Sequence, residues 1–242
     1  MKVLTNGACK LGIELDDNHQ RLFELYYQEL LDWNKKINLT TIVDYEAVQL
    51  KHFLDSLTAI LVLTKEELTS PGFSIIDIGT GAGFPGIPLK IVLPHIKLAL
   101  LDSTAKKTTF LCHLVKKMKL LDVDVITGRA EEVAHYPLYR QQFNLVVSRA
   151  VASMSTLVEL TLPFCKVGEK FVAYKKGKID EEIREAAGAL DIMGGKITEI
   201  KKVGIEELGN ERYLVVVKKI CQTSDKYPRR SGIPARKPIG RE

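Results

Sequence analysis

The chain has 242 residues, of which 45% are hydrophobic and 27% are charged, and it carries a formal net charge of +5. This is the composition of an ordinary globular protein, and it excludes wholesale disorder. No apolar run approaches the roughly 20 residues that a membrane-spanning helix needs, and the N-terminus lacks the apolar core of a secretory signal, so we expect no membrane segment and a cytoplasmic location.

The four cysteines are widely spaced, and none belongs to a C-x-x-C pair. Zinc sites and disulfide frameworks rely on cysteines at characteristic close spacings. The sequence therefore predicts no metal site, and it fits a reducing compartment.

The N-terminal part has the apolar periodicity of helices from residue 14 to residue 64. Asp16 and Asp44 are each placed to cap a helix, because a side-chain oxygen there accepts an otherwise unpaired backbone N–H. The segment Thr69-Ser70-Pro71-Gly72 is a turn signal and a plausible domain boundary. We therefore predict a helical N-terminal extension over residues 1–69.

Short apolar runs alternate with helical patterns after this boundary. The runs lie at 73–78, 96–101, 123–127, 143–148 and 169–174, and the helical patterns at 86–93, 104–120, 129–135, 153–165 and 179–191. Such alternation predicts a parallel sheet covered on both faces. Two further runs, 196–203 and 212–219, have no helix between them and are expected to pair antiparallel at one edge. We predict an α/β domain over 70–220 with a Rossmann-like mixed seven-stranded sheet whose last strand is antiparallel, the pattern of class I S-adenosylmethionine-dependent methyltransferases.

A glycine-rich loop follows the first of these strands. Gly81, Gly83 and Gly86 match G-x-G-x-x-G, the dinucleotide signature, which is weak by itself. The wider pattern D-x-G-x-G-x-G begins at Asp77 and includes Gly79, and it suits S-adenosylmethionine better. The Asp77 carboxylate favours the cationic amino-acid end of that cofactor, directly or through water, and would repel a pyrophosphate. Asp77 and the antiparallel strands thus argue against the alternative of an NAD-type oxidoreductase.

Two acidic residues follow the next two strands. Asp102 comes about 20 residues after the glycines, where an acid accepts hydrogen bonds from ribose hydroxyls, although it is also placed to cap the next helix. In this architecture the turn Gly128-Arg129-Ala130-Glu131 lies beside the adenine. Glu131 is explained equally well as an acid that stabilises a helix N-terminus.

At this point the chain resembles the ribosomal RNA small subunit methyltransferase G family, also called glucose-inhibited division protein B. The matching segments are 33–40, 52–57, 77–88, 128–132, 148–150 and 227–234. The resemblance implies N7 methylation of one guanosine in 16S ribosomal RNA near the decoding region, with S-adenosylmethionine as the cofactor. The cofactor contacts that it implies are Gly79, Phe84, the stretch beginning with Asp102, Ser103 and Thr104, and also Ala130, Glu131 and Arg149.

The end of the fourth strand, Val146-Val147-Ser148-Arg149-Ala150, agrees with such a reaction. It lacks the (D/N)-P-P-(Y/F) turn of exocyclic amine methylation, the Pro-Cys pair of cytosine C5 methylation and the Lys-Asp-Lys-Glu set of ribose methylation. Guanine N7 attacks with a lone pair and loses no proton, so catalysis can rest on positioning and electrostatics without a general base.

Arg149 is the candidate catalytic residue. Its guanidinium fork suits the carboxylate of the cofactor or an RNA phosphate. A structural ion pair is the alternative. His52 and Asp55 are three positions apart on one predicted helix, where a local polar contact is favoured over a catalytic pair, and Trp33 is expected in the core.

The C-terminal tail, residues 221–242, is basic and contains several prolines. From Lys218 to Glu242 the chain has eight basic and two acidic residues, a net of +6, whereas the preceding 217 residues sum to −1. We expect phosphate contacts with RNA from the following side chains of the tail: Lys226, Arg229, Arg230, Arg236 and Lys237. A solubilising tail is the alternative explanation.

The expected partner is therefore 16S rRNA or the small ribosomal subunit, bound by a monomeric enzyme. A non-catalytic RNA-binding module is disfavoured by the intact glycine loop together with Asp102. Methylation of a protein or of a small molecule stays open, although it leaves the basic tail without a role.

Overall fold

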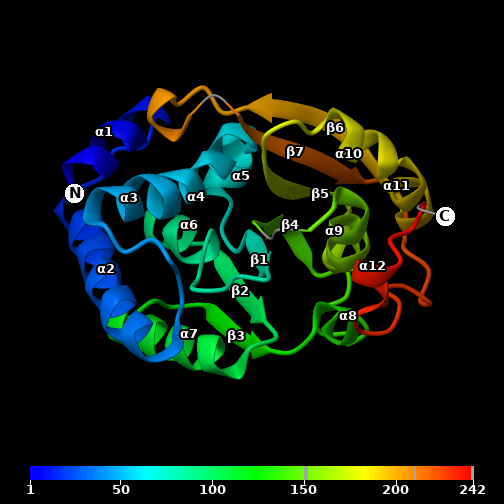
Figure 1. Cartoon of the computed structure of the whole chain (residues 1–242), viewed down its shortest axis with the longest axis horizontal. Helices are drawn as coiled ribbons and strands as arrows, with labels where there is room; N and C mark the ends of the chain where they lie inside the picture. Colours follow the sequence, from blue (N-terminus) through cyan, green and yellow to red (C-terminus); the bar gives the residue numbers. More distant parts are fainter. Residues whose placement is uncertain (150–151, 210, 241–242) are drawn as a thin grey trace.

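The computed structural model describes residues 1–149, 152–209 and 211–240 (Figure 1). Ala150 in the predicted acceptor turn, and Arg241 and Glu242 in the basic tail, lie outside these residues. The strands are β1 Ser74–Ile78, β2 Lys97–Asp102, β3 Val123–Thr127, β4 Phe143–Ser148, β5 Cys165–Lys176, β6 Gly195–Lys202 and β7 Arg212–Lys219. They form one seven-stranded sheet in the order β3-β2-β1-β4-β5-β7-β6.

The predicted strand directions are confirmed. Strands β1 to β5 pair in parallel, and β7 pairs antiparallel with both β5 and β6. The last strand in the sequence thus lies inside the sheet, and β6 forms the edge. Because parallel strands end at the same side of a sheet, the loops after β1, β2 and β4 meet at one edge, where ligands bind in this kind of architecture.

Helices cover both faces of the sheet (Figure 1). The first group is α1 Lys2–Lys10, α2 Asp17–Ile37, α3 Tyr45–Val48, α4 Asp55–Leu57, α5 Lys65–Thr69, α6 Gly86–Val92 and α7 Ala105–Met118. The second group is α8 Ala130–Val133, α9 Met154–Thr161, α10 Asp180–Glu185, α11 Ala187–Met193 and α12 Ile233–Arg236. Short 3-10 segments are η2 Thr58–Val62, η3 Leu162–Phe164 and η4 Glu206–Leu208.

The N-terminal extension is helical, as predicted, but it differs in detail. Asp16 caps α2 in a capping box with His19, and Asp44 caps α3. The second predicted helix is not continuous, because α3 passes into a π-helix, η1 Gln49–Leu54, before α4 and η2. The helix α1 was not expected, since Asn6 and Gly7 are weak helix formers. It is held by packing instead: a Cβ on Gly7 would lie 2.3 Å from the Leu54 side chain.

Two apolar clusters fill the space between the sheet and its helices. One contains side chains of α1, α2 and η1 together with Ile75 and Leu98 of the sheet, and the other packs α9 and α11 on the opposite face. The extension therefore shares one core with the sheet. The division at residues 69 and 220 stays an interpretation of the sequence. Over the described ranges, no helix combines the length and the hydropathy needed to span a membrane.

The basic tail packs against α8 and α9 rather than extending away (Figure 1). Its prolines prevent a long helix, as expected, and α12 is a single turn. Pro228, Pro234 and Ile239 are buried, which means that the tail contributes to the core on that side of the sheet.

Candidate functional site

The glycine loop is held in place by a buried carboxylate. Asp77 is fully buried in β1, and its Oδ2 accepts hydrogen bonds from Thr80 Oγ1 at 2.7 Å and from the Gly86 N–H at 2.8 Å. Its other oxygen, Oδ1, is buried without a partner among the described residues. Burial raises the pKa of Asp77 to about 6, although the two hydrogen bonds oppose this shift. Asp77 thus orders the loop and keeps one oxygen free for a cationic group.

Asp102 supports the same loop from the end of β2. Its Oδ2 accepts from the Gly81 N–H and its Oδ1 from the Thr104 N–H, both at 2.9 Å. The cap of α7 is Thr104, so the alternative assignment of Asp102 as that cap is wrong. Each carboxylate oxygen has a second lone pair. Asp102 can therefore still accept hydrogen bonds from ribose hydroxyls.

A cavity of about 150 Å³ lies beside this loop at the carboxyl edge of the sheet. Its lining contains Gly79, Asp102, Ser103, Ala130 and Glu131, five of the predicted cofactor residues, together with apolar side chains from the following residues: Ile78, Leu101, Leu157 and Leu160. An apolar wall with carboxylates at its rim suits a flat base joined to a ribose. Asp77, Gly81, Gly83, Phe84, Thr104 and Arg149 fall outside the described lining.

Phe84 belongs to the core instead of the cavity wall. Its ring is 5% exposed and stacks on Tyr26 at a centroid distance of 5.2 Å and on His52 at 4.6 Å. Tyr26 donates a hydrogen bond to the Ala82 carbonyl at 2.6 Å. A Cβ on Gly83, whose φ is 101°, would lie 2.7 Å from the Tyr26 hydroxyl. The N-terminal extension thus holds the glycine loop, and any cofactor contact from Phe84 has to come from its backbone.

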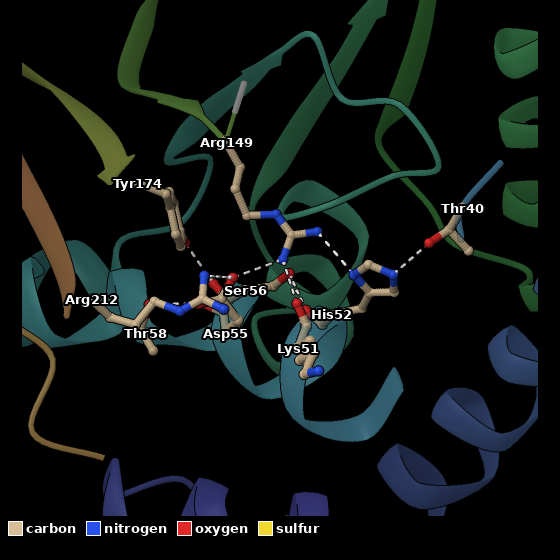
Figure 2. Close-up of polar contacts among 9 residues, drawn as sticks. All are labelled: Thr40, Lys51, His52, Asp55, Ser56, Thr58, Arg149, Tyr174 and Arg212. Carbon is tan, nitrogen blue, oxygen red and sulfur yellow. Dashed lines mark hydrogen bonds and ion pairs between the residues drawn. The ribbon is translucent and has the colours of Figure 1, made fainter. Parts of the chain in front are cut away.

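Arg149 follows β4 and meets the N-terminal extension (Figure 2). Its Nη1 donates to Asp55 Oδ2 at 2.9 Å and to the Lys51 carbonyl of η1 at 3.0 Å. Arg212 of β7 also pairs with Asp55, at 3.2 Å. The structural ion pair considered as the alternative for Arg149 is therefore present. A contact with the cofactor stays a prediction.

His52 and Asp55 meet at Arg149, and this common partner replaces the local contact expected between them (Figure 2). Arg149 Nη2 lies 3.4 Å from His52 Nδ1, and His52 Nε2 lies 2.9 Å from Thr40 Oγ1. Because arginine can only donate, Nδ1 is the acceptor, and the proton is on Nε2. Burial and the nearby Arg149 lower the pKa of His52 to about 4, so the ring is neutral near pH 7. Trp33 is half-buried and packs on Phe110 of α7 against the core rather than within it.

The basic tail is bound to α8, whose Glu131 also lines the cavity. Glu131 Oε1 accepts from the Gly232 N–H, and Glu132 accepts from Ser231 Oγ, both at 2.9 Å. Arg229 donates to the fully buried Glu159 from its backbone N–H, its Nε and its Nη2, at 2.8, 2.9 and 2.6 Å. Arg229 thus has an internal partner instead of the predicted phosphate. The remaining predicted RNA contacts are exposed: Lys226, Arg230, Arg236 and Lys237.

Several residues of this region were not predicted, namely Tyr26, Glu159, Tyr174 and Arg212. Glu159 had a signal, because an acid inside the apolar run from Met154 to Phe164 requires a partner. Tyr174 and Arg212 had no sequence signal, since their partners lie more than 100 residues away in the sequence. The Tyr174 hydroxyl donates to the Ser56 carbonyl at 2.6 Å.

Comparison with known proteins agrees with the fold. A SAM-dependent methyltransferase from Aquifex aeolicus superposes with a TM-score of 0.52 over 73% of this chain and 94% of that chain, at 19% sequence identity. The sheet order, the antiparallel last strand and the cavity at the carboxyl edge define a class I methyltransferase.

The family is shown by sequence. The chain belongs to the rRNA small subunit methyltransferase G family, whose model matches residues 19–214. A relative named ribosomal RNA small subunit methyltransferase G from Dehalococcoides mccartyi (strain CBDB1) is 49% identical over 99% of this chain and 100% of its own length. A relative of the same name from Alkaliphilus metalliredigens is 44% identical over 98% of both chains.

Proposed function

We propose that the protein transfers the methyl group of S-adenosylmethionine to N7 of one guanosine in the 16S rRNA of the small ribosomal subunit. It does so in the cytoplasm, as a monomer. The observation that carries this proposal is the cavity beside the glycine loop, lined by Asp102 and Glu131, in a chain of this family.

The side chains around the cavity fit this cofactor part by part. The apolar wall formed by Ile78, Leu101 and Leu157 suits the adenine. Asp102 has free lone pairs for the ribose hydroxyls. Asp77 lies outside the cavity lining, and its buried Oδ1, which has no hydrogen-bond partner among the described residues, favours the cationic amino group through its charge.

S-adenosylmethionine supplies an electrophilic methyl group on a sulfonium centre. The protein does not need to remove a proton from guanine N7, so its task is to bring N7 to about 3 Å from that methyl group in the correct direction. We propose that the Arg149 hydrogens left over from Asp55, Lys51 and His52 bind the cofactor carboxylate, which holds the amino-acid end beside the glycine loop.

The exposed cations of the tail complete the proposal. Lys226, Arg230, Arg236 and Lys237 present four positive charges beside α8, and the tail is the most basic part of the chain. Long-range attraction to RNA phosphates favours binding in this orientation.

The test uses small ribosomal subunits from cells that lack the protein. These are incubated with the protein and S-adenosylmethionine, and 7-methylguanosine is measured by mass spectrometry after digestion of the RNA. We expect wild type to form it, and Asp102→Ala to lose more than about tenfold in cofactor affinity and in product, because two loop contacts and the ribose acceptor disappear together. Asp180→Ala, at an exposed site outside the cavity lining, is the control. Cofactor binding without any methylated guanine would refute the proposed acceptor.

A further inference from the structure

A second and larger cavity, of about 530 Å³, lies over the end of β5 and the start of β7. It is at the same edge of the sheet as the cofactor cavity, because β7 runs antiparallel to β5. Ala152 lines both cavities, so they adjoin. Ligand pockets for small molecules have volumes of about 300–1,000 Å³, a range that includes a single nucleotide.

The charged lining of this second cavity is mainly cationic. It contains Arg149, Lys175, Lys176 and Arg212, against the two carboxylates of Asp55 and Glu182. Lys175 is neutralised locally, since its Nζ lies 2.6 Å from Glu182 Oε1 and 2.6 Å from the Ala152 carbonyl. The single carboxylate of Asp55 is shared by both arginines. A surplus of positive charge therefore remains.

The surplus positive charge lies mainly at one cross-strand pair of residues. Lys176 and Arg212 are register partners in the antiparallel pairing of β5 and β7. Like charges in this arrangement destabilise a sheet. Lys176 is exposed and has no ion pair with any described residue, and the Nε of Arg212 is buried without a partner there. The Lys176 ammonium and the guanidinium hydrogens of Arg212 that Asp55 does not use are donors of the kind that bind a phosphate group.

We propose that this cavity receives the target guanosine as a single unstacked nucleotide, with Lys176 and Arg212 on its phosphate and the base directed toward the cofactor cavity. The inference rests on the proposed function and deepens it. In an RNA duplex, N7 lies in a deep and narrow major groove that side chains cannot reach. A nucleotide taken out of the stack solves this problem, as in other enzymes that modify bases.

The test compares two charge reversals, Lys176→Glu and Lys178→Glu. Both lysines are exposed and lie two positions apart, but only Lys176 lines the cavity. Methylation of unmodified small subunits is measured as kcat/KM, and the Kd of S-adenosylhomocysteine is measured by calorimetry. We expect Lys176→Glu to lower kcat/KM by more than about tenfold, as for loss of a charge-assisted phosphate contact. Lys178→Glu should change it by less than about threefold, as expected for a screened surface charge. The Kd of S-adenosylhomocysteine should be unchanged in both.

Equal effects of the two reversals would overturn the proposal, and so would a weaker Kd for S-adenosylhomocysteine in Lys176→Glu, because the cavity would then belong to the cofactor. Binding of guanosine 5′-monophosphate in the presence of saturating S-adenosylhomocysteine is the second measurement. We expect Lys176→Glu, and not Lys178→Glu, to weaken it. Wild type could form no 7-methylguanosine while its binding of guanosine 5′-monophosphate still depends on Lys176. In that case the proposed reaction fails and the nucleotide site stands.

Discussion

The two ends of the chain both support the cofactor cavity, but they do so with different chemistry. The N-terminal extension holds the glycine loop through aromatic packing, with Tyr26 and His52 on either side of Phe84. The C-terminal tail holds α8 and α9 through polar contacts, chiefly Arg229 on Glu159 and Gly232 on Glu131.

This difference separates an apolar support from an ionic one. Aromatic packing is insensitive to salt and has no competitor in solution. An arginine on a carboxylate, next to further exposed cations, uses the interactions that an RNA phosphate also offers. The N-terminal support therefore preorganises the loop before the cofactor binds, whereas the C-terminal support lies where the RNA is proposed to arrive.

The largest expected effect breaks the N-terminal support. Tyr26→Ala should reduce the free energy of unfolding by about 5 kcal/mol, the upper end for removing a buried aromatic ring, because it also leaves the Ala82 carbonyl unpaired. Tyr26→Phe removes the hydroxyl alone and should cost about 1–3 kcal/mol. Urea unfolding measures both, and calorimetry should show weaker cofactor binding in Tyr26→Phe. Unchanged binding in that variant would mean that Tyr26 does not order the loop.

A second prediction breaks the C-terminal support. Arg229→Ala should cost about 3–4 kcal/mol, since it leaves the fully buried Glu159 as an unpaired charge. The neighbouring Arg230→Ala is the matched control, and it should change stability by less than about 0.5 kcal/mol because Arg230 is exposed. The double variant Arg229→Ala with Glu159→Gln should recover part of the loss. Equal stabilities of the two single variants would contradict the ion pair as the anchor of the tail.

The pH dependence of stability sharpens the comparison, because the β1 carboxyl that orders the glycine loop, Asp77, has a raised pKa. The folded-state pKa of Asp77, about 6, is above its ordinary value of 3.8. The native state then binds more protons than the unfolded state between these values, so this carboxyl makes stability fall as pH rises through the window. The shift corresponds to about 3 kcal/mol.

The contribution of Asp77 has to be measured as a difference in stability between two variants, because His52 changes the stability with pH in the opposite direction. The pKa of His52 is lowered from 6.5 to about 4, so its contribution makes stability rise as pH rises from 4 to 6.5. Unfolding of wild type and Asp77→Asn is therefore compared from pH 4 to pH 7. The stability of the variant relative to wild type should increase with pH. A stability difference between the two proteins that does not change with pH would show that the pKa of Asp77 is not raised in the folded state.

The smallest expected effect concerns the exposed cations of the tail. If Lys226, Arg230, Arg236 and Lys237 all contact phosphates, the logarithm of RNA affinity should fall with the logarithm of salt concentration with a slope near −3 for single strands. Arg230→Gln should reduce the slope by about 0.7. Tyr26→Phe should leave the slope unchanged, since the N-terminal support holds no phosphate. A slope near zero for wild type would exclude the tail as an RNA contact.

The fold was largely predictable because its signals are local. Alternation of apolar runs and helical patterns gave all seven strands and the antiparallel position of the last one. The β5 boundary differs from the prediction: the structure begins this strand at Cys165, four residues earlier than expected. The helix α1 was missed because tertiary packing of Gly7 on Leu54, and not helix propensity, holds it.

The site was predictable where residues follow strand ends, and less so where partners are distant. Asp102 and Glu131 line the cavity at the position that their places after strands predict, and their contact with the cofactor stays a prediction. The buried location of the Phe84 ring depends on Tyr26 in another helix, which no local pattern encodes. The tail shows the same limit: composition identifies Arg229 as one more basic residue, and only the fold brings Glu159 to it.

The place of β7 in the sheet has a consequence for how the protein is made. Strands emerge from the ribosome in sequence order, yet the last of them lies between β5 and β6. Until Arg212–Lys219 has emerged, β5 has one edge without its final neighbour, and Asp55 lacks one of its two arginines. Unpaired strand edges are the surfaces through which incomplete chains associate. A product truncated before this strand would therefore combine an unfinished active site with a tendency to aggregate.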